Sequence, residues 1–277
     1  MLSSVSETAL ITLKSRVVET RDPQKILNDT IAIQLYNSLE NKLIDESAGR
    51  IFKKKLPRLL TRYISMRSRK FDQYTQKFID KYPDGLIVSL GCGFDTRYWR
   101  THLNTNQYIE LDLPDVMQLK KDLLSDEIKY RTIGLSVLDH DWISQIRNIQ
   151  TKHVLFLAEG LFMYLPESEV VNLVKRLADQ FNESELVMEV VKKKYTQGFN
   201  KKIVEMKMKN SLGSEAGASF SYGITGPDEI ESYHNGLKVM SEWSYFEEKD
   251  LKPALFKLFK YSKLISRTQW TMQIKIT

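Results

Sequence analysis

The sequence predicts an α/β fold in which helices come first and a mostly parallel sheet follows. Apolar residues in the first 82 positions recur only at helical spacing. From Leu86 onward, short apolar runs alternate with amphipathic stretches, as in parallel strands connected by helices. The final run alternates apolar and polar residues, which indicates an antiparallel strand. We therefore expect an N-terminal helical cap over residues 1–82 and a sheet-containing core over residues 83–277.

The expected cap contains three helices. In the first, Leu10, Leu13 and Val17 recur at helical spacing. The second is expected to begin at Asp22-Pro23, because proline fits the first turn of a helix. The third runs through "MRSRKFDQYTQKFIDKY" and ends where "YPDG" supplies a proline and a glycine.

Seven strands are expected in the core, five of them parallel before an antiparallel finish. In chain order they are "LIVSLG", "QYIELDLP", "YRTIGLSV", "HVLFLA", "ELVMEVV", "LKVMSEWSYFE" and "TQWTMQIKIT". In the last of them, Trp270, Met272 and Ile274 alternate with polar neighbours. Residues 192–236 interrupt the strand–helix rhythm. We expect an inserted lid there, helical at first and loop-like afterwards.

Composition excludes several classes of protein. The chain of 277 residues is 42% hydrophobic and 27% charged, which is typical of a globular protein. Its single cysteine, Cys92, excludes intrachain disulfides and zinc sites built on cysteine pairs, and it favours an intracellular location. The histidines are scattered, and no run approaches the roughly 18 apolar residues of a membrane span. We expect a cytoplasmic protein without a metal ion or a membrane partner.

The formal net charge of +6 raises the question of a nucleic-acid partner. Basic residues gather between Arg50 and Lys70 and again in "VKKKY" near Lys193. Surfaces that bind nucleic acids commonly combine such residues with aromatic side chains in recognisable motifs, and these stretches do not. We interpret them as solvated helix faces and expect no nucleic-acid partner.

The stretch "LIVSLGCGFDTRYWR" places Gly91 and Gly93 at the tip of a buried strand. Ligands of α/β sheets bind at the carboxyl ends of the strands, and glycine lets a ligand approach the backbone. About 20 residues later, Glu110 and Asp112 share a face of the next strand, where a carboxylate can accept hydrogen bonds from ribose hydroxyls. Asp112 is the better candidate because it lies nearer the strand end. Since the third glycine of a dinucleotide motif is missing, we expect a nucleoside without phosphates, with S-adenosyl-L-methionine (SAM) as the leading ligand.

Three motifs resemble those of the leucine carboxyl methyltransferase family. They are "IVSLGCGFDTRYWR", "YIELDLPDVMQLKKDLL" and "LFLAEGLFMYLPESEVVNLVKRL". The resemblance spans nearly the whole chain and is closest to the bacterial and archaeal branch, typified by the tetracenomycin polyketide carboxyl O-methyltransferases. It implies the Rossmann-like fold of a class I SAM-dependent methyltransferase, with a seven-stranded, mostly parallel sheet whose last strand is antiparallel.

The resemblance also implies a cofactor site. Gly91 and Gly93 would pack against the methionine part of SAM, and Arg67 would pair with its carboxylate. Asp112 would bind the ribose. Glu159 would lie in the cofactor site, with the cationic groups of SAM compensating its buried charge. The full set of implied cofactor-binding residues is Arg67, Gly91, Cys92, Gly93, Asp112, Leu113, Ser136, Val137 and Glu159.

The adenine contact is left open between Ser136, Val137 and Asp139. The eukaryotic phosphatase methyltransferases of this family have Asp-Leu where this chain has Ser136-Val137. This difference favours the bacterial branch and argues against the tail of a phosphatase as the substrate.

The expected reaction is SAM-dependent O-methylation of a carboxylate in a small, anionic, polyketide-like molecule. A carboxylate is ionised at neutral pH and needs no base, whereas a phenol with a pKa of about 10 does. No histidine can be assigned as a base, and His140 is the nearest. Tyr164 and Arg67 are the expected catalytic residues, with Tyr164 orienting the acceptor. The alternatives are phenolic O-methylation, a non-catalytic SAM-binding module and, disfavoured by the missing glycine, a Rossmann oxidoreductase.

Overall fold

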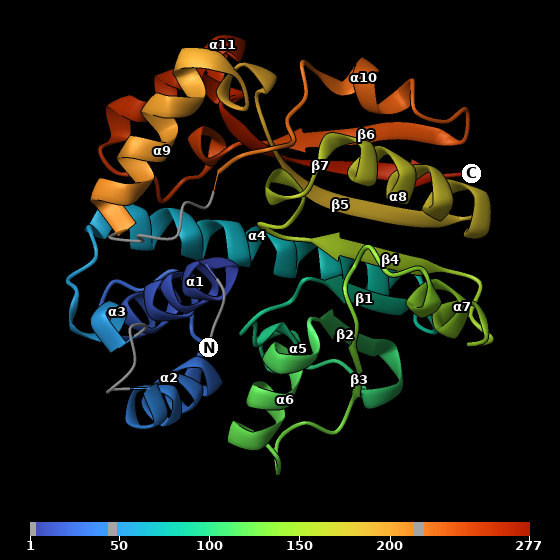
Figure 1. Cartoon of the computed structure of the whole chain (residues 1–277), viewed down its shortest axis with the longest axis horizontal. Coiled ribbons are helices and arrows are strands. Elements are labelled where there is room, and N and C mark those ends of the chain that lie inside the picture. Colours follow the sequence, from blue (N-terminus) through green and yellow to red (C-terminus); the bar gives the residue numbers. More distant parts are fainter. Residues whose placement is uncertain (1–3, 44–48, 213–218) are drawn as a thin grey trace.

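The computed structural model describes residues 4–43, 49–212 and 219–277. Its seven-stranded sheet has the strand order β3-β2-β1-β4-β5-β7-β6 (Figure 1). The first five strands are parallel, and β7 runs antiparallel to both β5 and β6. The strands are β1 (Leu86–Leu90), β2 (Tyr108–Asp112), β3 (Arg131–Gly134), β4 (Val154–Ala158), β5 (Ser184–Val191), β6 (Leu237–Trp243) and β7 (Gln269–Ile276). All seven correspond to strands expected from the sequence, so the predicted α/β fold is confirmed.

Helices precede the sheet and connect its strands. The α-helices are α1 (Ser4–Arg21), α2 (Thr30–Leu43), α3 (Gly49–Lys53), α4 (Arg58–Lys81), α5 (Arg97–Arg100), α6 (Pro114–Leu123), α7 (Asp141–Arg147), α8 (Glu167–Gln180), α9 (Gly198–Leu212), α10 (Pro227–Glu231) and α11 (Lys263–Ser266). The 3-10 helices are η1 (Thr105–Gln107), η2 (Phe162–Tyr164), η3 (Lys193–Tyr195), η4 (Tyr245–Glu247) and η5 (Ala254–Tyr261). Within the described ranges, no helix combines the length and apolar character needed to cross a membrane.

The second helix begins later than the sequence predicted. It was expected to start at Asp22-Pro23, but α2 starts at Thr30. The Asp22 carboxylate accepts the amide N–H two residues further on at 2.7 Å, which stabilises a turn in place of a helix. Asp29 then accepts the amide N–H of Ala32 at 3.1 Å, as an N-cap residue does. Side-chain acceptors therefore set the start of α2 in place of the proline.

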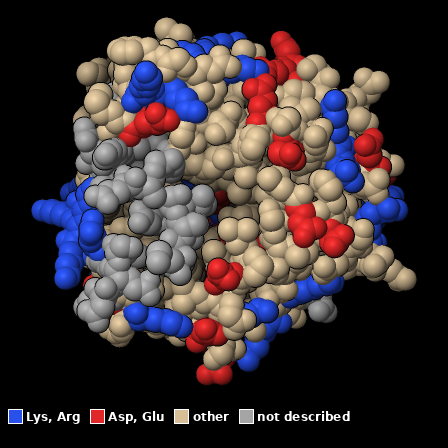
Figure 2. Space-filling view, in the orientation of Figure 1, with Lys and Arg blue, Asp and Glu red and all other residues tan. Residues whose placement is uncertain are grey.

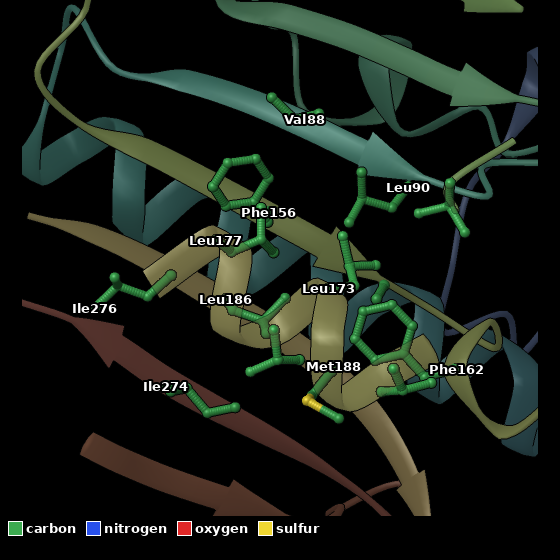
Figure 3. Packing of buried hydrophobic residues seen from close by; sticks show 14 of the residues in the cluster. Val88, Leu90, Phe156, Phe162, Leu173, Leu177, Leu186, Met188, Ile274 and Ile276 are labelled. Carbon is green, nitrogen blue, oxygen red and sulfur yellow. The ribbon is translucent and has the colours of Figure 1, made fainter. Parts of the chain in front are cut away.

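The sheet is covered by helices on both of its faces. Successive residues of β1 point to opposite sides, so Val88 packs in the cluster that contains α8 and Ile87 in the cluster that contains α4. Figure 3 shows Phe156 of β4 and Leu186 of β5 in the first cluster, near Leu173 of α8. Burying a side chain of this kind stabilises the fold by roughly 1.5–3 kcal/mol. These two apolar layers hold the strand ends, and with them the site, in a fixed arrangement.

The basic stretch from Arg50 to Lys70 is not a solvated helix face throughout. Arg62 is 9% exposed and pairs with Glu19 at 2.9 Å, and Arg67 is 8% exposed. Ion pairs with acidic side chains engage Arg58, Arg62, Arg67 and Arg69. The interpretation of this stretch as a solvated face is therefore wrong for Arg62 and Arg67, whereas the Arg58 side chain is 72% exposed. Figure 2 shows acidic and basic side chains interspersed over the face in view.

Candidate active site

A cavity of about 220 Å³ lies where β1, β2 and β4 end. Because β1 lies between β2 and β4, the loops that follow these strands converge there. Helices α1 and α4 contribute further residues to the cavity wall. All ten residues expected from the sequence line it, namely Arg67, Gly91, Cys92, Gly93, Asp112, Leu113, Ser136, Val137, Glu159 and Tyr164. None of the described residues of the expected lid, 192–236, does so.

The two glycines form a turn that other residues would strain. Gly91 has a φ of +57° and Gly93 a φ of +51°, a region that L side chains rarely adopt. A Cβ atom on Gly91 would lie 2.5 Å from a methyl carbon of Leu161, and one on Gly93 would lie 3.1 Å from Cβ of Ala9. The glycines therefore allow both the turn and the close approach of α1 to it.

Asp112 reaches the cavity, whereas Glu110 does not. The Asp112 carboxylate accepts the amide N–H groups of Gly93 at 2.6 Å and Leu113 at 2.7 Å. Since a carboxylate has about four lone-pair sites, it can accept further hydrogen bonds from a ligand. Burial raises the pKa of Asp112, and these amide groups act in the opposite direction. Glu110 is fully buried and receives hydrogen bonds from Lys120 at 2.7 and 2.8 Å.

Glu159 is paired with two arginines. Arg67 donates from Nε to Glu159 at 2.9 Å, and Arg97 donates from Nη2 to the other oxygen at 2.5 Å. Burial alone would raise the pKa of Glu159. The two guanidinium groups lower this pKa by more than burial raises it, so it lies below the ordinary value. The expectation that a ligand cation compensates this charge is therefore wrong, because the protein supplies the cations itself. Sequence reasoning did not identify Arg97.

Glu189 is a second carboxylate on Arg67 that sequence reasoning missed. It is 1% exposed and accepts a hydrogen bond from Nη1 of Arg67 at 2.9 Å. Its other oxygen accepts from the Tyr245 hydroxyl at 3.0 Å and from Nε2 of Gln269 at 2.6 Å. The signal in the sequence was an acidic residue inside the apolar run "ELVMEVV", since a buried charge requires partners. Arg67 keeps three of its five N–H groups beyond the two that bind these glutamates.

Two buried cations hold the backbone that follows the glycines. Nζ of Lys120 donates to the carbonyl oxygen of Asp95 at 2.5 Å, and Nη2 of Arg16 donates to that of Phe94 at 2.6 Å. Lys120 belongs to α6 and Arg16 to α1, so the turn is fixed from two sides. Asp95 also lies 2.7 Å from Nη1 of Arg97. Burial raises the pKa of Asp95, but the nearby arginines bring it below its ordinary value.

The three candidates for the adenine contact lie in the segment that follows β3. Ser136 and Val137 line the cavity, but Asp139 does not. Asp139 accepts the amide N–H of Asp141 at 3.2 Å, at the start of α7. His140 also lies outside the cavity wall, in which the described residues place no histidine.

Tyr164 lines the cavity as a neutral hydroxyl group. Burial raises its pKa to about 12, and the charge of Glu189 acts in the same direction. Its ring lies 5.7 Å from that of Phe220, centroid to centroid. Tyr164 therefore stays protonated at neutral pH and can donate a hydrogen bond.

Comparisons with known proteins agree with this arrangement. The family model described as leucine carboxyl methyltransferase matches residues 9–178. The tetracenomycin polyketide synthesis O-methyltransferase TcmP of Streptomyces glaucescens is 30% identical over 254 residues, which cover 91% of this chain and 87% of that protein. The SAM-dependent methyltransferase dpfgK of Gibberella zeae is 26% identical over 86% of this chain and 81% of its own. A solved structure from Thermobifida fusca, classed with the methyltransferases, shares the fold with a TM-score of 0.58 at 16% identity, covering 88% of this chain and 94% of that one.

Fold, site and relatives together define a SAM-dependent O-methyltransferase. The chain belongs to the leucine carboxyl methyltransferase family. Its methyl donor is SAM, and two features of the cavity fit that molecule. Both glycines line the cavity, and Asp112 has lone pairs left for hydroxyl groups. The relatives give no support to the oxidoreductase alternative.

Proposed function

We propose that this enzyme methylates the carboxylate of a small, anionic, polyketide-like molecule. The observation that carries the proposal is the lack of a suitable base among the described residues of the cavity wall. No histidine lies there, and the pKa values of Asp95 and Glu159 are lowered by the arginines beside them. Asp112, whose pKa burial raises, accepts backbone N–H groups with both of its oxygens and is assigned to the ribose. Tyr164, with a pKa of about 12, stays protonated. A carboxylate acceptor needs no base, because it is already ionised at neutral pH. The polyketide O-methyltransferase among the relatives supports the choice of substrate class.

For SAM, we propose a set of contacts distributed around the cavity. Asp112 would accept hydrogen bonds from the ribose hydroxyls, with Leu113 beside it, and Ser136 and Val137 would contact adenine. Arg67 would pair with the carboxylate of the methionine part. Gly91, Cys92 and Gly93 would pack against that part of the ligand. Bound SAM supplies an electrophilic methyl group on a sulfonium.

The protein's own task in this reaction is to align the groups and exclude water. Tyr164 would donate a hydrogen bond to one acceptor oxygen and leave the other free to react. Arg67, fixed by Glu159 and Glu189, would hold the cofactor in one orientation, so that its role in catalysis is positional. Neither residue has to exchange a proton.

We also propose that residues 1–82 form a cap on the site and that residues 192–236 form a lid. Helix α1 contributes Thr8 and Arg16 to the cavity wall, which supports the role of the cap. In the proposed lid, Phe220 packs on Tyr164, and the amide N–H of Ser221 donates to the carbonyl of Met163 at 2.8 Å. These contacts with Tyr164 and Met163 support the proposed role of the lid.

An alkali test separates carboxyl from phenolic methylation. Enzyme and SAM labelled in the methyl group are incubated with a set of aromatic carboxylic acids and phenols. Asp112→Asn serves as a matched blank. A methyl ester releases labelled methanol in mild alkali, whereas an aryl methyl ether keeps its label. We expect alkali-labile label on a carboxylic acid. Label that survives alkali would contradict the proposal and assign the activity to phenols.

A further inference from the structure

A short segment near the end of the chain exposes large apolar side chains next to lysines. Leu255, Leu258, Tyr261 and Leu264 are 68%, 59%, 77% and 63% exposed. Among the described residues, eleven large apolar side chains are exposed, and with Phe259 five of them fall within residues 255–264. Isolated exposed apolar residues are ordinary, but contiguous ones mark interaction surfaces. We name residues 255–264 the apolar-basic segment.

Two phenylalanines of the apolar-basic segment pack against the rest of the protein. Phe256 packs against the buried cluster that contains Met66 and Trp243. The rings of Phe256 and Phe259 stack with centroids 5.8 Å apart, and Phe259 meets Phe246 edge-on at 5.6 Å. Helix α11, in which the segment ends, lies at the periphery of the molecule (Figure 1). The exposed side chains therefore project from a fixed base.

The same segment is positively charged. Residues 251–277 contain six basic and no acidic residues. Three of these cations, Lys257, Lys260 and Lys263, lie inside the apolar-basic segment. Arg267 pairs with Glu242, whereas no acidic side chain of the described residues forms an ion pair with these three lysines. The segment thus differs from the stretch between Arg50 and Lys70, where four arginines are paired within the protein.

We propose that the apolar-basic segment docks the enzyme on the surface of an anionic lipid bilayer. Ammonium groups bind anionic head groups, while leucine and tyrosine side chains enter the boundary between head groups and acyl chains. Exposures above one half indicate side chains that protrude and do not line a groove, and a soft bilayer accepts such a surface without a complementary pocket. A second copy of the chain fits less well, because a symmetric contact sets lysines against lysines. The expectation of no membrane partner came from the lack of a spanning segment, and peripheral docking requires none.

Sedimentation with vesicles tests this proposal on the full chain. We expect binding to vesicles of phosphatidylcholine mixed with phosphatidylglycerol, weaker binding at high salt, and little binding to phosphatidylcholine alone. Replacing Lys257→Gln, Lys260→Gln and Lys263→Gln should weaken binding by about fivefold for each lysine. The double variant Leu258→Ser and Tyr261→Ser should weaken it by at least about tenfold.

Matched variants elsewhere on the surface are the controls. Met240→Ser removes an apolar side chain that is 54% exposed, and Lys152→Gln and Lys238→Gln remove exposed charges. These variants should bind vesicles like the wild type. Failure of the wild type to bind anionic vesicles, or equal losses in the control variants, would overturn the proposal. A concentration-dependent dimer that Leu258→Ser abolishes would also overturn it and assign the surface to a second copy.

Discussion

Nη1 of Arg67 lies 2.9 Å from Oε2 of Glu189, a carboxylate that is buried behind the cavity wall. Tyr245 and Gln269 hold the other oxygen of Glu189, so this carboxylate has little freedom to move. Glu159 fixes Arg67 from a second direction. The guanidinium group is therefore positioned by residues from β5, η4 and β7 and from the loop after β4 before any ligand binds.

We predict that Glu189→Gln weakens SAM binding by about tenfold, or about 1.5 kcal/mol, because the amide is a poorer partner for Arg67. Calorimetric titration with SAM measures this. Glu185→Gln is the matched control, since Glu185 lies on the same strand, is 8% exposed and accepts from Gln273 at 2.8 Å. Equal losses in the two variants would show that Glu189 acts on the fold and not on Arg67.

Substitution of Asp112 should affect both SAM binding and stability, whereas substitution of Glu110 should mainly affect the stability of the fold. Asp112→Asn removes hydrogen-bond acceptors for the ribose, so we expect SAM affinity to fall by about 1–3 kcal/mol. It also leaves the amide N–H of Gly93 or Leu113 without its acceptor, so we expect a loss of about 1–3 kcal/mol in unfolding free energy. Glu110→Gln leaves the buried Lys120 without its counter-charge, so we expect a loss of about 3–5 kcal/mol in unfolding free energy. Calorimetry and urea denaturation of both variants check the pair. A folded Asp112→Asn protein with unchanged SAM affinity would refute the ribose assignment.

The pKa of Glu159 predicts how stability depends on pH. Arg67 and Arg97 hold this pKa below its ordinary value, so the folded state binds a proton less readily than the unfolded chain. The stabilisation is present above the ordinary pKa of about 4.3 and is lost as pH falls through the folded value. We expect Glu159→Gln to be less stable than the wild type by about 3–5 kcal/mol at pH 7, with the difference shrinking below about pH 4. Urea denaturation across this range measures it, and a difference that does not change with pH would contradict the pairing.

A Cβ atom at residue 93 should disturb the site in two separable ways. Gly93→Ala introduces an alanine at a φ of +51°, which costs about 1–2 kcal/mol, and brings its Cβ 3.1 Å from that of Ala9. We expect weaker SAM binding and a lower melting temperature. Ala9→Gly should relieve the contact but not the backbone strain. A double-mutant cycle measures that partial rescue, and fully additive effects would show that α1 does not press on the turn.

The strands and the ligand-binding end of the sheet were predictable because their signals are local. Short apolar runs identified the parallel strands, and alternating apolar and polar residues identified β7. The spacing between Gly93 and Asp112 identified two neighbouring strand ends, and the structure joins them by a 2.6 Å hydrogen bond. Resemblance to the family added Arg67 and Glu159, and the structure brings both to the cavity.

The partners of the buried charges were not predictable, because they come from distant parts of the chain. Arg97 is 62 residues from Glu159, and Arg67 is 122 residues from Glu189. Neither pair has a spacing that a single sequence reveals. The start of α2 was missed for a related reason, since Asp29 caps the helix at Ala32 and outweighs the preference of proline for a first turn.

The pH dependence of the chemical step tests most directly whether the acceptor is a carboxylate. Burial keeps the pKa of Cys92 raised and that of Tyr164 at about 12, while Asp95 and Glu159 titrate below their ordinary values. Single-turnover methyl transfer to an identified acceptor is measured between about pH 6 and 9. We predict a constant rate, because the acceptor carboxylate, with a pKa of about 4, is fully ionised throughout this range. A rate that rises tenfold per pH unit would contradict the assignment of a carboxylate acceptor, because the reaction would then require deprotonation of the acceptor or of a base.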